Sequence, residues 1–168
     1  MKNCFCGDYG RQKLTFYPAP FKSPIRAFIV LLFAWIDGKV VICDIQGRGW
    51  CVPSGRVEPG EDSLTAVRRE AKEEAGIELA DLQYIGCYRI EDRGEVRWGD
   101  CFAARICKFT DIGIPEESKG RKAVLIEELP ELYHYWNAMT ENVFQHSHCV
   151  VKRLESVKGP CEAPEGEL

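Results

Sequence analysis

The chain has 168 residues, of which 45% are apolar and 29% are charged, and its formal net charge at pH 7 is −4. This composition is typical of one globular domain with a buried core and excludes intrinsic disorder for the chain as a whole. The mild negative charge gives no strong nucleic-acid signal and does not favour an anionic membrane. A polyanionic ligand would therefore need local positive charge or a metal ion.

The nine cysteines show no regular disulfide framework, and the sequence opens without the pattern of a secretory leader. Both features predict reduced thiols and a cytoplasmic location. The longest apolar run, residues 27–36, is far shorter than the roughly 20 residues that span a bilayer. It predicts a buried strand and no membrane association.

The first part of the chain predicts an arm followed by strands. Residues 1–24 contain three prolines and several aromatic residues, which predicts an N-terminal arm that packs irregularly or mediates contacts. A strand is expected over 26–35, and Asp37-Gly38 predicts a two-residue hairpin turn into a second strand over 39–44. After a break at 47–49, a short strand over 50–53 leads into residues 55–77.

Residues 63–75 predict a helix that concentrates negative charge on one face. Asp62 or Ser63 can cap its start, and Gly76 suits its end. At about 100° per residue, Glu70, Glu73 and Glu74 fall within an arc of about 100°. Such like charges repel, and a hard divalent cation is the plainest reason to gather them. The alternative is a solvated helix face, which is what most charge runs are.

The opposite face of this helix carries a narrow apolar stripe that predicts packing against a sheet. Its members are Leu64, Val67, Ala71 and Ala75. The stretch is thus expected to form a loop, a helix and a second loop, with one buried face and one acidic face.

The rest of the chain predicts more strands and a final helix. Strands over 82–90 and 96–109, with a turn at 92–94, predict a hairpin, and a polar loop over 110–121 leads to a strand over 122–126. A helix with an apolar face is expected over 131–154, and residues 158–168 are expected to be disordered. This order predicts a mixed sheet with helices on its faces, within a domain over 25–157.

Residues 55–77 resemble the signature motif of the Nudix hydrolases. That motif is Gly, five residues, Glu, seven residues, Arg-Glu, an aliphatic residue, any residue, Glu-Glu, any residue, Gly and an aliphatic residue. Its fixed positions are filled here by Gly55, Glu61, Arg69, Glu70, Glu73, Glu74, Gly76 and Ile77. The small Ala71 stands where a bulkier aliphatic residue is usual.

The resemblance implies an α/β fold, a Nudix-type α/β/α sandwich with a mixed β-sheet. It also implies Mg²⁺- or Mn²⁺-dependent hydrolysis of the pyrophosphate bond in a nucleoside diphosphate linked to another group, such as ADP-ribose or a sugar nucleotide, or in a nucleoside triphosphate. Bound metal would neutralise the phosphate oxygens and activate water.

The resemblance also assigns roles to the residues of the motif. It implies that Glu70, Glu73 and Glu74 bind the metal, joined by the carbonyl of Gly55. Arg69 precedes Glu73 by four residues and is expected to orient that carboxylate through a charge-assisted hydrogen bond. Glu61 is expected to brace the loop.

The general base and the substrate stay open at this point. The base is either Glu70 or a glutamate on the later loop, where Glu117 is better spaced than Glu116. Subfamily marks for ADP-ribose, dinucleoside polyphosphates and coenzyme A are missing. The arginine candidates for phosphate contacts are Arg26, Arg48, Arg56, Arg89, Arg93 and Arg97. Trp35, Trp50 and Trp98 are candidates for base stacking, although core packing is favoured for each.

Two other kinds of function are considered beside an enzyme. A non-catalytic nucleotide-binding or sensing module on the same fold would usually lose motif glutamates, so the intact set argues against it. The aromatic N-terminal arm and the C-terminal helix could instead form a homodimer interface, a role compatible with catalysis.

Overall fold

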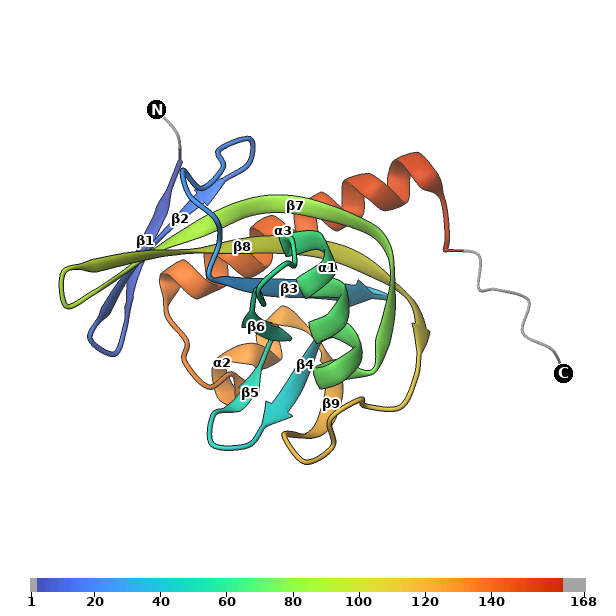
Figure 1. The fold of residues 1–168 in the computed structure, drawn as a ribbon. Helices are drawn as coiled ribbons and strands as arrows, with labels where there is room; N and C mark the ends of the chain where they lie inside the picture. The colour runs from blue at the N-terminus through green and yellow to red at the C-terminus, as the bar shows by residue number, and fades with distance from the viewer. Residues whose placement is uncertain (1–2, 162–168) are drawn as a thin grey trace, which may run out of the picture.

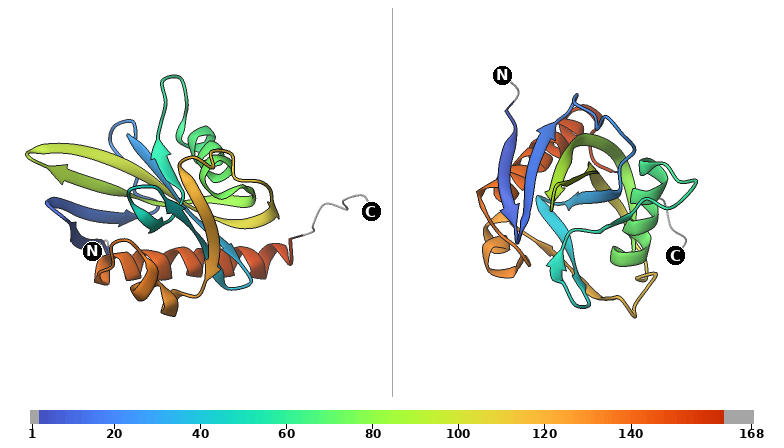
Figure 2. Two further views of the ribbon diagram at one scale, coloured as in Figure 1. Left: turned by 90° about the horizontal axis from the view of Figure 1, so that it is seen from below. Right: turned by 60° about the vertical axis from the view of Figure 1, so that its left-hand side comes forward.

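The structure, a computed structural model, describes residues 3–161, which form one mixed sheet with helices on both faces (Figures 1 and 2). The strands are β1 (Phe5–Tyr9), β2 (Gln12–Pro18), β3 (Ile29–Ile36), β4 (Lys39–Ile45), β5 (Gly49–Cys51), β6 (Ser54–Arg56), β7 (Ile77–Asp92), β8 (Glu95–Phe109) and β9 (Ser118–Val124). The helices are α1 (Ser63–Glu70), continued by the π-helical turn η1 (Ala71–Ala75), the 3₁₀ turn η2 (Ile126–Glu128), α2 (Leu129–Leu132) and α3 (Ala138–Lys158).

The sheet has the order β1-β2-β7-β8-β3-β4-β5, with β6 paired to β3 and β9 paired to β4. The central pair β3 and β8 is parallel, and the other strand pairs are antiparallel. Helix α1 covers one face and α3 covers the other (Figure 1). The expected α/β/α sandwich with a mixed sheet is therefore confirmed.

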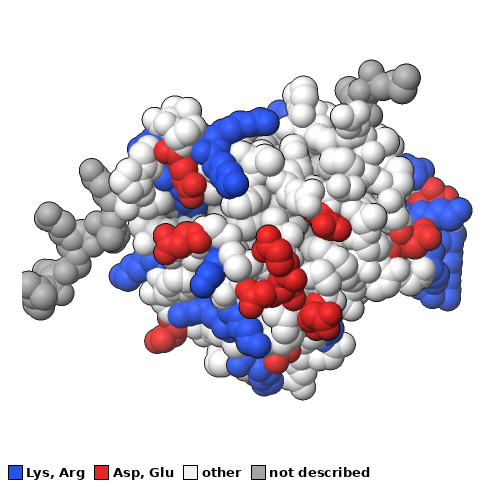
Figure 3. All heavy atoms as spheres, turned by 180° about the vertical axis from the view of Figure 1, so that it is seen from behind, with Lys and Arg blue, Asp and Glu red and all other residues white. Residues whose placement is uncertain are grey.

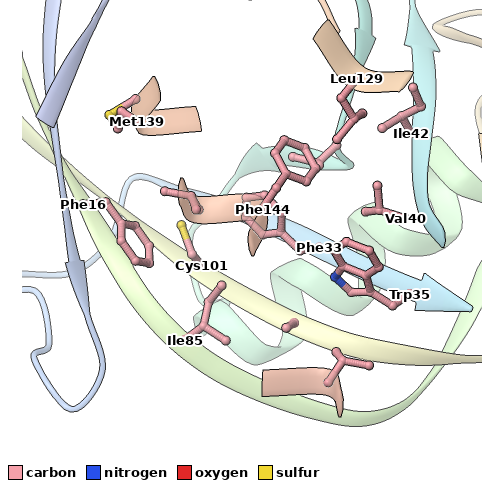
Figure 4. Close-up of a cluster of buried hydrophobic side chains, with 14 of the residues drawn as sticks. Phe16, Phe33, Trp35, Val40, Ile42, Ile85, Cys101, Leu129, Met139 and Phe144 are labelled. Carbon is pink, nitrogen blue, oxygen red and sulfur yellow. The ribbon is translucent and has the colours of Figure 1, made fainter. Parts of the chain in front are cut away.

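Strand β3 is apolar along its whole length because both of its faces are buried. Val30 and Leu32 belong to the core cluster beneath α1, whereas Phe33 and Trp35 belong to the cluster beneath α3. Successive side chains point to opposite faces, and both faces are covered by helices. Figure 4 shows the α3 cluster, where Phe33 packs edge-on against Phe144 with ring centroids 5.0 Å apart.

The N-terminal segment corrects the expected irregular arm. Residues 5–18 form the β1–β2 hairpin, and β2 pairs with β7 in the register Phe16↔Tyr88. Phe16 is fully buried in the α3 core cluster. The three prolines indicate irregular structure, yet Pro18 only ends β2, and Pro20 and Pro24 follow it. The hairpin thereby extends the sheet past the residues that were expected to form it.

The C-terminal helix is shorter at its start than expected. Residues 133–137 lie outside a helix, and α3 starts after Asn137, whose side chain accepts a hydrogen bond from the Thr140 backbone at 2.9 Å. The apolar pattern of this stretch is continuous with that of α3. However, Tyr133 and Trp136 pack from a loop instead of a helix turn.

Smaller differences concern element ends. Strand β7 starts at Ile77, immediately after α1–η1, and β9 starts at Ser118, inside the expected loop. Leu64 is 51% exposed, so the buried stripe of α1 runs through Ala66, Val67 and Ala71 instead. The Asp37-Gly38 turn is confirmed by the pairing of Ile36 with Lys39. The expected tail falls mostly outside the described residues.

Candidate active site

The loop before α1 is fixed by backbone contacts. Arg26 donates to the carbonyls of Glu58 and Glu61, at 2.6 and 2.8 Å. The Glu58 backbone N–H donates to Glu61 Oε2 at 3.0 Å, and Asp62 caps the helix by accepting from the Thr65 backbone at 2.7 Å. Glu61 therefore has the loop-bracing contacts expected of it. The same contacts show that Arg26 supports this loop.

Gly55 lies directly against the carboxylate of Glu70. An ideal Cβ built on Gly55 would be 1.9 Å from Glu70 Oε1, so any side chain at this position would force the Glu70 carboxylate to move. Strand β6 holds Gly55 opposite Val30 of β3, so the backbone has little freedom to move away. Glycine at this position therefore lets the Glu70 carboxylate keep its present place against the backbone.

Arg69 connects three carboxylates of the motif. It donates to Glu61 Oε1 at 2.7 Å, to Glu70 Oε1 at 2.8 Å and to Glu73 Oε2 at 2.9 Å. Its remaining nitrogen donates to the carbonyl of Arg56 at 2.9 Å. The hydrogen bonds from Arg69, together with the one from the Glu58 backbone, lower the pKa of Glu61 to about 2. The contact expected between Arg69 and Glu73 is present, but it is one part of a larger cluster.

Two of the glutamates are buried carboxylates. Glu70 and Glu74 are 6% and 5% exposed. Burial raises the pKa of Glu74 to about 7, with the charge of Glu70 acting in the same direction, although the Ser54 backbone donates to Glu74 Oε2 at 2.9 Å. Burial also raises the pKa of Glu70, against the opposing effect of Arg69. A cation beside them would favour their charged forms.

The helix ends in a π-helical turn, where a regular α-helix was expected. Over Ala71–Ala75 the turn widens, and Gly76 ends it at φ 58°. The loop over 110–118 provides donors to its carbonyls: the Gly113 N–H donates to the Lys72 carbonyl and the Ile114 N–H donates to the Glu73 carbonyl, each at 3.0 Å. The charge pattern of the side chains does not predict such a turn from the sequence. Single π-helical turns often occur at functional sites.

This loop also brings Glu117 to the acidic helix. The Ser118 hydroxyl donates to the Glu74 carbonyl at 2.5 Å, and the negative charge of Glu117 adds to the causes that raise the pKa of Glu74. Glu117 itself is exposed. The later loop and the motif helix therefore meet on the same side of the molecule.

The donor set of the motif suits a hard metal ion. Glu70, Glu73, Glu74 and the Gly55 carbonyl are hard oxygen donors, which suit Mg²⁺ or Mn²⁺. Within residues 3–161, no group of three or more carboxylate, histidine or cysteine side chains converges as a metal cage. Glu70 and Glu73 instead accept from Arg69, and Glu74 accepts from Ser54. The set fits a divalent cation in its chemistry and in the burial of two of its carboxylates.

A pocket of about 370 Å³ lies beside this cluster, and Ser54, Gly55 and Arg56 form one side of it. Most of its wall is aromatic or aliphatic and comes from segments far apart in sequence. That wall comprises Tyr9, Leu14, Phe28, Ile29, Leu31, Val52, Tyr88, Ile90, Tyr133, Tyr135 and Met139. A mainly apolar cavity with a few polar groups is typical of small-molecule sites.

The aromatic corner of the pocket is absent from the sequence-based expectations. Tyr9, at the end of β1, packs edge-on against Tyr135 at 4.9 Å and against His134 at 5.5 Å. The cluster of aromatic residues at 133–136 could indicate a binding site in the sequence, but its spacing also fits one face of a helix. Tyr9 has no local signal because only strand pairing brings it to the site.

The three tryptophan candidates lie elsewhere. Trp35 and Trp98 are 1% and 7% exposed, so core packing is confirmed for both. Trp50 packs partly against the α3 core cluster, with Lys122 over its ring at 4.5 Å. None of the three lines the described pocket.

Of the six arginine candidates, two line the pocket and four do not. Arg48 and Arg56 line the pocket, and Arg48 donates to the Ser54 hydroxyl at 3.1 Å. Arg89 pairs instead with Glu91 at 2.8 Å. Positive charge is thus available where the pocket meets Gly55.

Comparisons with known proteins place the chain in a family. The chain matches the NUDIX domain family over residues 18–146. It is 34% identical over 120 residues to the putative 8-oxo-dGTP diphosphatase YtkD of Bacillus subtilis, covering 71% of this chain and 73% of that protein. It is 25% identical over 119 residues to the asymmetrical bis(5'-nucleosyl)-tetraphosphatase of Caenorhabditis elegans, covering 66% of this chain and 86% of that protein.

A solved structure is similar over most of the chain. The Bacillus subtilis pyrophosphohydrolase BsRppH, solved in a mutant form, superposes with a TM-score of 0.70 at 26% identity, covering 92% of this chain and 97% of that one. The fold and the acidic helix beside the pocket define a hydrolase of the Nudix class. The chain belongs to the Nudix family, and the expected enzyme class, a pyrophosphohydrolase, is confirmed.

Proposed function

We propose that this chain hydrolyses the pyrophosphate bond of a nucleoside polyphosphate, with the nucleoside in the aromatic pocket and the phosphates at Gly55 and Arg56. The observation that supports this proposal most is that the pocket with aromatic walls is also lined by Gly55, whose backbone lies against the buried carboxylate of Glu70. The names of the relatives support a nucleoside triphosphate or a dinucleoside polyphosphate as the substrate.

In this proposal Glu70, Glu73, Glu74 and the Gly55 carbonyl hold Mg²⁺ or Mn²⁺. The bound metal neutralises charge on the phosphate oxygens and makes water nucleophilic near neutral pH. Arg69 keeps Glu70 and Glu73 together, and Glu61 in turn holds Arg69. Arg48 and Arg56 orient the phosphates.

Two carboxylates are candidates for taking the proton of the attacking water in this proposal. Glu70 is buried against Gly55, and Glu117 stands on the loop that is hydrogen-bonded to η1. Either can act as the general base, and their separate substitution decides between them.

The test is a panel of ADP-ribose, sugar nucleotides, dinucleoside polyphosphates and nucleoside triphosphates, assayed with Mg²⁺ and with Mn²⁺. We expect metal-dependent product from a nucleoside triphosphate or a dinucleoside polyphosphate. Binding of these compounds without turnover would favour the non-catalytic module instead. A panel with neither binding nor product would refute the proposed function.

No helix among residues 3–161 is long and apolar enough to cross a membrane. A cytoplasmic location, a homodimer and the domain limits at residues 25 and 157 stay predictions, and the family match begins earlier, at residue 18. Gel filtration tests the homodimer.

A further inference from the structure

One segment of the chain, residues 110–121, supplies hydrogen-bond donors to the whole end of the acidic helix. The last carbonyls of a helix have no partner within the helix and need donors from elsewhere. Here each of the backbone carbonyls of residues 72–76 accepts a hydrogen bond from this segment. Backbone N–H groups serve Lys72, Glu73 and Gly76. Side chains of the segment serve the carbonyls of Glu74, Ala75 and again Gly76.

These side-chain donors are Ser118 and Arg121, which both belong to β9. The buried Ser118 hydroxyl donates to the Glu74 carbonyl at 2.5 Å. Arg121 Nη1 donates to the carbonyls of Ala75 at 2.8 Å and Gly76 at 3.0 Å, and a cation is favoured at this end of a helix. Because β9 pairs with β4 in the sheet, both donors come from a rigid element.

The same guanidinium joins the segment to itself. Arg121 also donates to the Thr110 carbonyl at 2.5 Å and lies 4.8 Å from the ring centroid of Phe109. A Cβ added to Gly76 would be 2.5 Å from the Thr110 oxygen and 2.6 Å from Arg121 Nη1. The end of the helix and the segment are therefore in close contact around one arginine.

The conformation of this turn decides where two of the motif carboxylates point. Glu73 and Glu74 lie within the π-helical turn, where Gly76 N–H bonds to the Ala71 carbonyl in addition to that of Lys72. A π-helical turn contains one more residue than an α-helical turn. Conversion of this turn to a regular α-helix would therefore rotate Glu73 and Glu74 relative to Glu70. Glu74 is held at both ends, since its carboxylate accepts from the Ser54 N–H at 2.9 Å.

We propose that Ser118 and Arg121 are positioning residues for the metal-binding carboxylates. They hold the π-helical turn through its carbonyls, and the turn directs Glu73 and Glu74 toward the cation. This inference rests on the proposed function. Both residues lie outside the motif over 55–77, and they act through the backbone of η1. Substitution of groups that support metal ligands typically costs about 10- to 100-fold in metal affinity.

Binding of Mn²⁺ alone, followed by electron paramagnetic resonance without nucleotide, tests this proposal. We expect Ser118→Ala and Arg121→Met each to weaken Mn²⁺ binding at least about tenfold. Arg121→Lys keeps a cationic donor, so its affinity should recover to within about threefold of the wild type. Ser118→Ala removes a single oxygen atom, which keeps the test decisive even if Arg121→Met does not fold.

Matched controls come from α3, on the other side of the sheet from α1. Ser156→Ala also removes a hydroxyl that donates to a carbonyl, that of Arg153 at 2.8 Å, and Arg153→Met removes an exposed guanidinium. Figure 3 shows the side of the molecule that α3 covers, where basic and acidic side chains are interspersed. Both controls should bind Mn²⁺ as the wild type does.

Two further measurements separate positioning from mere stabilisation. At saturating Mn²⁺, the KM for the nucleotide should stay within about twofold of the wild-type value in Ser118→Ala, because the hydroxyl lies under the turn and not in the pocket. A lower melting temperature with Mn²⁺ affinity equal to that of the controls would overturn the inference while the proposed function still stood. A wild-type protein that does not bind Mn²⁺ would overturn both.

Discussion

Substitution of Gly55 by alanine tests how the motif works. The new Cβ would lie 1.9 Å from Oε1 and 2.2 Å from Cδ of Glu70, so the carboxylate must leave its place. Overpacking of this kind costs about 1–3 kcal/mol of unfolding free energy. For a chain of this size, each kcal/mol lowers the melting temperature by roughly 2–4 °C. Displacing a metal-binding carboxylate by about 1 Å should lower kcat about 100-fold.

The assay compares thermal unfolding and metal-dependent turnover of Gly55→Ala with those of Gly120→Ala. Gly120 lies in β9, where an added Cβ meets no atom within 4 Å. The control should therefore keep both stability and activity. If Gly55→Ala had a melting temperature and kcat within error of the control, the close approach of Gly55 and Glu70 would not be required.

Four further predictions concern single side chains. Arg69→Met leaves clustered carboxylates without their donor, so urea unfolding should show a loss of about 2 kcal/mol, and no loss would contradict this role. The pKa of Glu74 is raised from 4.5 to about 7, so in EDTA the stability it contributes is complete below pH 4.5 and is lost as the pH rises through 7. The melting temperature of Glu74→Gln should therefore change less with pH over that range than that of the wild type. Equal pH dependence in the two proteins would refute the assignment. Tyr9→Ala should raise KM about tenfold with less effect on kcat, as expected when stacking on the nucleobase is lost. An unchanged KM would show that the nucleobase does not stack on Tyr9. Glu117→Gln should lower kcat at least about tenfold if Glu117 is the general base. A rate equal to that of the neighbouring control Glu116→Gln would leave Glu70 as the general base.

The sequence is most informative where residues act through local spacing. The contact between Arg69 and Glu73 follows from their separation by four residues on a helix. Gly76 at the helix end and the Asp37-Gly38 turn are likewise local, because backbone conformation selects the residue type. The apolar run of β3 predicts a buried strand, although it does not identify the strands beside it.

The missed features depend on distant parts of the chain. Tyr9 reaches the pocket only because β1–β2 adds to the edge of β7, a pairing that has no local signature. The π-helical turn over 71–75 is favoured by the loop at 110–118, whose backbone N–H groups donate hydrogen bonds to carbonyls of the turn. Leu64 fits an apolar helix stripe by spacing, yet no element covers it in the described chain.

The most direct test of the account is the rate of nucleoside triphosphate or dinucleoside polyphosphate hydrolysis by wild-type protein and by Glu73→Gln, each with saturating Mg²⁺ and with EDTA. We predict turnover by the wild type only with Mg²⁺, and a loss of at least about 100-fold in the variant, with circular dichroism unchanged. Glu73 is suited to this test because it is only partly buried, with a side chain 35% exposed. Equal rates for the two proteins, or wild-type turnover that persists in EDTA, would contradict the assignment of α1 and η1 as the metal-dependent active site.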